Sequence, residues 1–183
     1  MPRNWDDHYA GCSNLDFTPA ALLVEVAELL PPGRALDLAC GAGRNSLYLA
    51  SLGWQVTAVD SSPVAIRILR DRARGLDVDA RVADLETGEF RIEPAGYDLI
   101  CDFYYLQRDL FPRIREGVRP GGTFAGAIHL FDSSSDAPPR NPAFLLRPQE
   151  LRAAFADWKI VFYSEAREPG QSRPAARIIA RRA

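Results

Sequence analysis

The stretch RALDLACGAGRNSLYLA, Arg34 to Ala50, decides the fold expected for this chain. It opens with an apolar, strand-like run, passes through a Gly-x-Gly turn at Gly41 and Gly43, and continues with helical apolar spacing from Arg44. Glycine accepts a positive φ and lets a ligand approach the backbone, and a helix start offers N–H groups and a positive dipole end. This order is typical of the nucleotide-binding corner of a doubly wound sheet. Taken alone, it is also compatible with a tight turn that binds nothing.

Length and composition fit one α/β domain of 183 residues, with 47% hydrophobic and 25% charged residues. A net charge of −2 gives no bulk attraction to nucleic acid or to an anionic membrane. No run approaches membrane-spanning length, and the N-terminus has no apolar signal core. Cys12, Cys40 and Cys101 lack metal-ligand spacing, and His8 and His129 are far apart. We therefore expect a cytoplasmic protein with free thiols, no metal site, and no nucleic-acid or membrane partner.

Strand-like and helical segments alternate along the chain up to residue 130. The expected strands are 35–40, 54–59, 77–83, 97–103 and 123–130. The expected helices begin after a Thr18 N-cap, at Arg44, at Ser61-Ser62-Pro63 and near Gln107. This alternation predicts a Rossmann-like, doubly wound α/β fold whose sheet is mostly parallel.

The C-terminal part departs from that rhythm. Residues 131–147, rich in serine and proline, are expected to form a long loop, and such loops are often lids or binding segments. The runs 158–166 and 175–181 are joined by a link too short for a crossover helix, so we expect an antiparallel C-terminal hairpin. The chain then reads as one domain, 19–183, preceded by an N-terminal lid segment, 1–18.

Polar residues follow the expected strands where each one ends. Asp60 and Asp84 directly follow the second and third strands and Asp102 lies at the end of the fourth, as the glycine turn comes after the first. The carboxyl ends of parallel strands share one edge of a sheet, so these residues are expected to line one crevice. A carboxylate after the second strand can bind both hydroxyls of a ribose, and one after the third can bind the exocyclic amine of adenine. Each acid alone could also be a surface residue or a helix cap.

The sequence resembles the class I S-adenosylmethionine-dependent methyltransferases over nearly its whole length. The resemblance rests on LDLACGAG (36–43), Val59-Asp60, Ala83-Asp84-Leu85, YDLI (97–100) and RPGG (119–122). The expected C-terminal hairpin also matches that family, whose last strand is antiparallel. Residues 40–50 and WDDHY (5–9) resemble the tellurite-resistance and thiopurine methyltransferase-like branch. Tellurite-resistance proteins carry a His-Arg pair near the hairpin, whereas this chain has AREPG (166–170) there, which puts tellurite chemistry in doubt.

The resemblance implies that S-adenosylmethionine is the cofactor and that a small molecule accepts its methyl group. The implied cofactor-binding residues are Trp5, Tyr9, Ala39, Gly41, Gly43, Arg44, Asp60, Ser61, Asp84, Leu85, Asp102 and Phe103. Asp60 would bind the ribose hydroxyls, and Asp84 with Leu85 the adenine edge. Asp102 would hold the α-amino group, and Arg44 could meet the methionine carboxylate. The two aromatic residues of the N-terminal segment would close over the cofactor.

Methyl transfer from a sulfonium is an in-line displacement, so the protein mainly has to position the acceptor. Candidates for positioning, or for a base where the acceptor must lose a proton, are Tyr104, Tyr105 and His129. Tyrosines at such a place also serve as aromatic walls. Two alternatives stay open: a non-catalytic cofactor-binding partner subunit, and an NAD(P)-dependent oxidoreductase, whose fingerprint would want glycine where Ser46 stands. The expected assembly is a monomer or a homodimer.

The acceptor pocket is expected from residues 131–147, the tyrosines after the fourth strand and the aromatic segment 5–9. Its aromatic character suits a small, partly apolar acceptor better than a polynucleotide. Arg140 and Arg147 could add a contact to an anion, although arginines of this kind are more often solvated at the surface.

Overall fold

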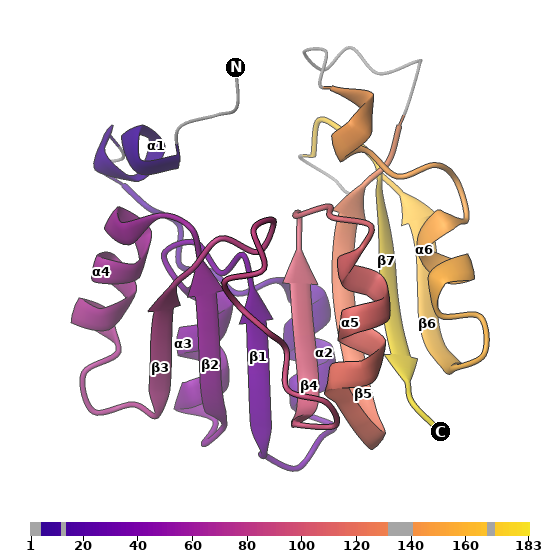
Figure 1. Cartoon of the computed structure of the whole chain (residues 1–183), viewed down its shortest axis with the longest axis horizontal. Helices are drawn as coiled ribbons and strands as arrows, with labels where there is room; N and C mark the ends of the chain where they lie inside the picture. Colours follow the sequence, from indigo (N-terminus) through magenta and orange to yellow (C-terminus); the bar gives the residue numbers. More distant parts are fainter. Residues whose placement is uncertain (1–4, 12–13, 132–140, 168–170) are drawn as a thin grey trace. The chain divides into compact units, whose positions relative to one another are not determined.

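The computed structural model describes residues 5–11, 14–131, 141–167 and 171–183. The chain divides into two compact units, Met1–Arg91 and Ile92–Ala183 (Figure 1). Each unit has strands of its own with helices packed against them. None of the helices in the described ranges is long and apolar enough to span a membrane.

The first unit is built on three parallel strands with β2 in the middle. They are β1 (Arg34–Leu38), β2 (Gln55–Asp60) and β3 (Val78–Val82). The helices of this unit are α1 (Trp5–Gly11), α2 (Ala21–Ala27), α3 (Arg44–Ser51) and α4 (Pro63–Arg72). The expected strands and the expected starts of α3 and α4 are confirmed, with strand ends that differ by one or two residues.

The core of the first unit lies on both faces of its strands. Ala35 and Leu36 are neighbours in β1 and therefore point to opposite faces, yet both are fully buried. Leu49 from α3 and Leu69 from α4 are also fully buried. A strand covered on both faces is characteristic of a parallel sheet flanked by helices.

The two helix caps expected in the first unit have different outcomes. Ser62 caps α4: its hydroxyl accepts a hydrogen bond from the Ala65 N–H at 3.1 Å, and proline follows at the first helical position. The expected Thr18 cap is wrong, because α2 begins only at Ala21. The Thr18 N–H instead donates to the Asp16 carboxylate at 2.8 Å, which holds this residue in a turn.

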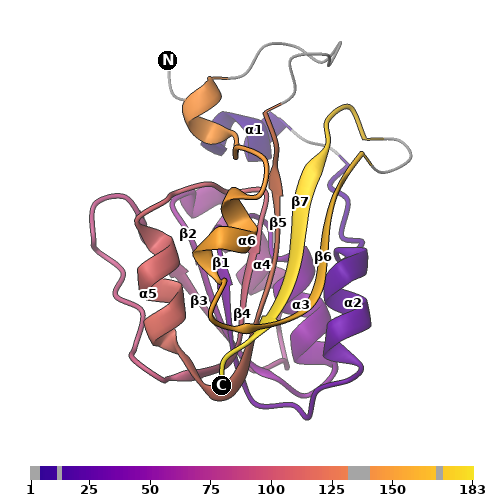
Figure 2. The same ribbon diagram turned by 90° about the vertical axis from the view of Figure 1, so that its right-hand side faces the viewer.

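The second unit contains four strands in the order β4-β5-β7-β6. They are β4 (Tyr97–Phe103), β5 (Val118–His129), β6 (Lys159–Ala166) and β7 (Ala175–Arg181). Strands β4 and β5 are parallel, whereas β7 is antiparallel to both β5 and β6. The helical segments are α5 (Leu110–Gly117), η1 (Pro142–Phe144) and α6 (Glu150–Ala154). The antiparallel C-terminal hairpin is therefore confirmed, and Figure 2 shows β6 and β7 side by side.

Strand β5 starts earlier than expected, because the RPGG stretch lies inside it. The predicted start at residue 123 is wrong by five residues, since the strand begins at Val118. Gly121 has a φ of +78°, and the pairing of β4 with β5 shifts register between Tyr97 and Leu99. The expected turn is thus an irregularity within a strand, which the glycine conformation permits.

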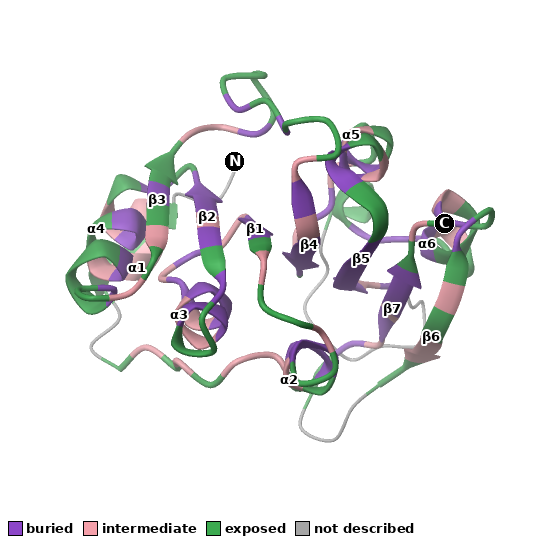
Figure 3. Ribbon diagram, turned by 90° about the horizontal axis from the view of Figure 1, so that it is seen from below, coloured by how far each residue is buried: buried purple, intermediate pink, exposed green. Residues whose placement is uncertain are grey.

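Aromatic packing connects α6 to the sheet of the second unit. The rings of Phe155 and Phe124 stack with centroids 4.6 Å apart, and Trp158 packs edge-on against Phe155. The two terminal guanidinium nitrogens of Arg115, Nη1 and Nη2, each contact an oxygen of the Asp157 carboxylate at 2.6 Å beside this cluster. Strand β7 is largely buried and β6 largely exposed (Figure 3), as expected for a strand at the edge of a sheet.

Candidate functional site

The turn between β1 and α3 has an unusual backbone. Ala39, Gly41 and Gly43 all have positive φ, at +51°, +56° and +86°. A Cβ atom on Gly43 would lie 2.3 Å from a methyl carbon of Leu69, so close helix packing requires glycine there. The expected glycine turn is thus present, with both glycines in the positive-φ conformation that they accept more readily than other residues.

Asp60, the last residue of β2, connects the glycine turn to α4. Its Oδ2 atom accepts a hydrogen bond from the Gly41 N–H at 2.8 Å, and its Oδ1 atom accepts one from the Ser62 N–H at 2.9 Å. The side chain is 9% exposed, and this burial raises the pKa of the carboxyl although both hydrogen bonds favour the charged form. Each oxygen keeps a second lone pair with which it can bind a hydroxyl group.

A second buried carboxylate, Asp37 in β1, is a site residue that the sequence reasoning missed. It is 1% exposed and its Oδ2 atom accepts a hydrogen bond from the Ser46 hydroxyl at 2.6 Å. Burial raises the pKa of this carboxyl to about 6, and the Ser46 bond opposes that shift. Its signal in the sequence is an acidic residue between Leu36 and Leu38. The dinucleotide fingerprint would need glycine at position 46, yet here the serine hydroxyl ties α3 to β1.

Helix α1 lies against the glycine turn and the start of α4. A Cβ atom on Gly41 would be 2.2 Å from the Tyr9 hydroxyl oxygen, so that hydroxyl rests directly on the turn. The Asp6 carboxylate accepts a hydrogen bond from the Ser62 hydroxyl and lies 3.4 Å from the Val64 nitrogen. Two separate contacts therefore hold this helix at the candidate site.

The remaining predicted residues of the first unit surround the same strand ends. Trp5 is 45% exposed, and its ring lies 6.5 Å from that of Tyr9. Arg44 opens α3 and donates to the Thr18 carbonyl at 3.4 Å. Ser61 is exposed after β2, Asp84 accepts from the Glu86 N–H at 2.8 Å, and Leu85 is buried.

In the second unit, Asp102 and Phe103 end β4 and are both buried. Tyr104 follows with a φ of +70°, a conformation that is uncommon for any residue but glycine. Its N–H donates to the Ala127 carbonyl of β5 at 2.6 Å. Backbone strain of this kind costs on the order of 1–3 kcal/mol and is often found where a side chain must be aimed at a site.

Tyr104 meets His129 at the end of β5, with ring centroids 4.9 Å apart. Two of the three candidate positioning residues are therefore neighbours. The third, Tyr105, donates its hydroxyl to the Gln107 side chain at 2.9 Å. No group of three or more His, Cys, Asp or Glu residues in the described ranges could hold a metal ion.

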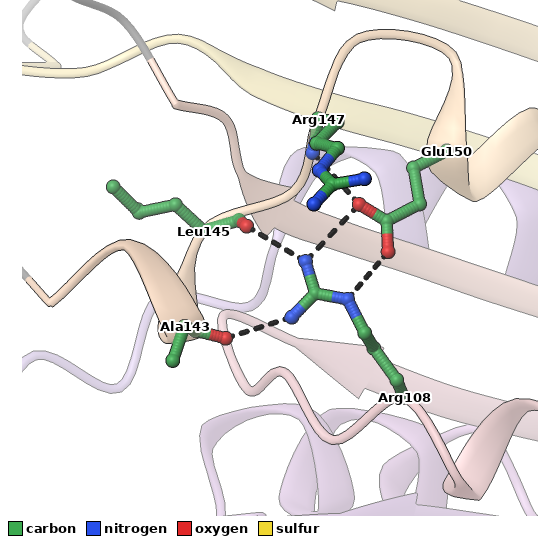
Figure 4. Close-up of polar contacts among 5 residues, drawn as sticks. All are labelled: Arg108, Ala143, Leu145, Arg147 and Glu150. Carbon is green, nitrogen blue, oxygen red and sulfur yellow. Dashed lines mark hydrogen bonds and ion pairs between the residues drawn. The ribbon is translucent and has the colours of Figure 1, made fainter.

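Arg108, just before α5, holds together the segment that follows β5 (Figure 4). Its Nε and Nη2 atoms contact the two carboxylate oxygens of Glu150 at 2.5 and 3.1 Å. Its Nη1 atom donates to the Ala143 carbonyl at 2.8 Å, and Nη2 donates to the Leu145 carbonyl at 3.0 Å. The hydrogen bonds from Arg108 lower the pKa of Glu150. Sequence reasoning missed this pair, because no local pattern links residues 42 positions apart.

A cavity of about 530 Å³ lies beside this cluster, within the second unit. It is lined by Arg108, Phe131, Pro142, Ala143, Leu145 and Arg147. Phe131 and residues 142–147 come from the segment in which we expected the acceptor pocket. Arg140, the other arginine singled out there, lies outside the described residues.

This arrangement can be compared with known proteins. Residues 4–171 match the family model described as Tellurite resistance protein TehB. The chain belongs to the TehB family. A probable S-adenosyl-L-methionine-dependent methyltransferase TehB of Haemophilus influenzae is 30% identical over 151 residues, covering 78% of this chain and 52% of that protein. This TehB-family chain thus spans about half the length of the curated relatives it matches.

Solved structures agree on the fold of this TehB-family chain. The crystal structure of TehB from Haemophilus influenzae matches with a TM-score of 0.81 and 24% identity, over 98% of this chain and 67% of that one. A Burkholderia thailandensis 1,6-didemethyltoxoflavin-N1-methyltransferase, bound to 1,6-didemethyltoxoflavin and S-adenosylhomocysteine, matches with a TM-score of 0.64 and 22% identity. It covers 89% of this chain and 79% of that one. The expected class I methyltransferase fold is therefore confirmed.

Proposed function

We propose that this chain is a methyltransferase that uses S-adenosylmethionine and acts on a small-molecule acceptor. The observation that carries the proposal is the hydrogen bond from the Gly41 N–H to Asp60, which joins the positive-φ turn to a buried carboxylate. Membership of the TehB family supports it, because a relative that is 30% identical is described as a probable S-adenosylmethionine-dependent methyltransferase.

The residues of the first unit fit the cofactor in two physical respects. Gly41 has no side chain, and the Tyr9 hydroxyl takes the space that a Cβ would fill, so a group bound at this turn would contact Tyr9 as well as the backbone. Asp60 has unused acceptor capacity beside that backbone, which suits the two hydroxyls of a ribose. Asp84 and Leu85 are proposed to bind the adenine, and Arg44 at the start of α3 the methionine carboxylate.

The second unit is proposed to supply Asp102 and Phe103 to the amino-acid end of the cofactor, and Tyr104 with His129 to the acceptor. When bound, S-adenosylmethionine supplies a methyl group activated by the sulfonium charge. The protein then has to hold the acceptor atom in line with that methyl group and keep water away. His129 is suited to take a proton from an acceptor that must lose one, and the strained Tyr104 backbone fixes the ring beside it.

We also propose that residues 1–18 form a lid on a methyltransferase domain of residues 19–183. Tyr9 over Gly41 and Asp6 at the start of α4 support this assignment. Cys40 is a free thiol, which suits the reducing cytoplasm. A monomer or a homodimer is the assembly we propose.

The proposal is tested by release of S-adenosylhomocysteine from S-adenosylmethionine in the presence of a panel of small acceptors. Turnover with at least one acceptor, lowered by Asp60→Ala at subsaturating cofactor, is the expected result. Cofactor binding without turnover on any acceptor would instead support a non-catalytic partner subunit. Binding of NADH in place of S-adenosylhomocysteine would overturn the proposal.

A further inference from the structure

We propose that the cavity beside Arg108 binds the acidic group and part of the apolar body of the methyl acceptor. The acceptor class is thus a small, partly apolar molecule with a single carboxylate-like group. This inference rests on the proposed function only in that it identifies the ligand as the methyl acceptor. The binding site itself is argued from the charges, walls and volume of the cavity.

The charges around the cavity do not cancel. Arg108 forms a two-point ion pair with Glu150, which therefore neutralises one guanidinium group. The Arg147 N–H also donates to this carboxylate at 2.8 Å, but that contact uses the backbone and not the side-chain charge. In the described parts of the chain, the Arg147 guanidinium has neither a hydrogen bond nor an ion pair (Figure 4). Among the described residues around the cavity, two guanidinium groups and one carboxylate leave one positive charge for a ligand.

One unneutralised arginine suits one acidic group. The guanidinium is planar and can bind a carboxylate through two parallel hydrogen bonds. A polyphosphate would bring several charges, whereas the part of the cavity wall that the structure describes offers one unneutralised cation. The charge balance therefore favours a monoanion over a nucleotide.

The other walls of the cavity are apolar. Phe131, Pro142, Ala143 and Leu145 line it, and Phe131 as a whole residue is 51% exposed. A volume of about 530 Å³ falls within the range of roughly 300–1,000 Å³ that is typical of small-molecule sites. An aromatic or aliphatic group of moderate size would cover this ring while its acidic group meets Arg147.

These walls are fixed before a ligand arrives. Arg108 binds the Ala143 and Leu145 carbonyls, and the Phe131 N–H donates to the Leu146 carbonyl at 2.8 Å. A preformed site loses less conformational entropy on binding. The Leu146 N–H donates to the His129 carbonyl at 2.9 Å, which ties the cavity wall to the end of β5 that carries the candidate base.

The test uses two probes of nearly equal shape, indole-3-acetate and indole-3-acetamide, which differ in charge. Dissociation constants are measured by calorimetry and ligand-observed NMR, with and without S-adenosylhomocysteine, for wild type, Arg147→Gln, Arg147→Lys and Arg181→Gln. Arg181 is the matched control. In the pairing of β7 with β5 it lies opposite Thr123, whereas His129 lies at the other end of that pairing.

We expect wild type and Arg181→Gln to bind the acid about tenfold more tightly than the amide, the effect of one charge-assisted contact. Arg147→Gln should abolish that preference and Arg147→Lys should restore part of it. The preference should also shrink as sodium chloride is added, because Arg147 is exposed. Equal affinity for the two probes in wild type, an unchanged preference in Arg147→Gln, or no binding of either probe would overturn the inference.

The affinity for S-adenosylhomocysteine separates this inference from the proposed function. Arg147→Gln should leave that affinity unchanged. If wild type binds S-adenosylhomocysteine but shows no preference for the acid, the proposed function survives and only the acceptor class is wrong. If the acid preference is present but S-adenosylhomocysteine does not bind, the cavity assignment survives and the proposed function fails.

Discussion

The Gly41 N–H and the Asp60 carboxylate form a hydrogen bond of 2.8 Å that joins the turn after β1 to the end of β2. The bond orients the carboxylate toward the turn and holds the turn in its positive-φ conformation. The same carboxylate accepts from the Ser62 N–H, so one side chain joins the turn after β1, the end of β2 and the start of α4. The geometry of the proposed cofactor site is therefore set by Asp60.

Gly41→Ala should destabilise the protein through two separable effects. The φ of +56° disfavours any L side chain by roughly 1–2 kcal/mol, and the new methyl group would collide with the Tyr9 hydroxyl. Urea unfolding of Gly41→Ala in the wild-type and Tyr9→Ala backgrounds separates them. The penalty should be smaller in the Tyr9→Ala background, whereas equal penalties would mean that Tyr9 does not rest on the turn in solution.

Asp37→Asn should make stability less dependent on pH. The folded-state pKa of about 6 lies above the ordinary value of 3.8, so this carboxyl favours the folded state while protonated. This stabilisation is fully present below pH 3.8 and is lost as the pH rises through about 6. The complete loss lowers the free energy of unfolding by about 3 kcal/mol. Asparagine can still accept from Ser46 but does not ionise.

The measurement for Asp37 is urea unfolding of both proteins at several pH values between about 4 and 7. The free energy of unfolding of Asp37→Asn, relative to wild type, should rise across this range. A constant difference would contradict the account. The charge of Asp60 is one cause of the raised Asp37 pKa, so the difference between the two proteins includes this repulsion as well as the burial of Asp37.

Arg108→Ala should loosen residues 141–150 more than the rest of the second unit. The change removes the ion pair with Glu150 and both carbonyl contacts, while the buried aromatic cluster around Phe155 stays intact. Hydrogen exchange should accelerate in that segment at least several-fold. Arg115→Ala, which removes a two-point pair with Asp157, serves as the control and should leave the exchange of residues 141–150 unchanged.

Asp6→Ala should release helix α1 and weaken the binding of S-adenosylhomocysteine. The substitution removes the contact with the Ser62 hydroxyl, but that hydroxyl can still cap α4 by accepting from the Ala65 N–H. Asp7→Ala, an exposed neighbour on the same helix, is the control. Faster hydrogen exchange in residues 5–11 with unchanged ligand affinity would show that α1 is not part of the site.

Local patterns predicted most of the fold. The bounds of β4 and β7 agree with the expected runs, because continuous apolar residues mark a buried strand and polar turns limit it. The start of β5 was missed, since Pro and Gly in the RPGG stretch are typical of a turn. The start of α2 was missed because Asp16 draws Thr18 into a turn that competes with a helix cap.

The candidate site was less accessible from the sequence. The glycine turn and Asp60 are local features of strand ends, and the structure joins them by a hydrogen bond. The contact of Ser46 with Asp37 depends on how α3 packs against β1. The spacing of apolar residues in the sequence does not predict that packing. The contact of Arg108 with Glu150 needs the tertiary fold of a segment with no regular pattern. Exposed charges carry no periodic signal, so their partners appear only in three dimensions.

Calorimetric titration of S-adenosylhomocysteine against wild type, Asp60→Asn and Asp60→Ala tests the central claim most directly. Wild type should bind, and Asp60→Ala should lose about 1–3 kcal/mol, because the ribose hydroxyls would lack their acceptor. Asp60→Asn, which keeps one oxygen, should fall between them. Asp71→Ala, an exposed carboxylate on α4, should bind like wild type. Equal affinity for wild type and a folded Asp60→Ala would contradict the account.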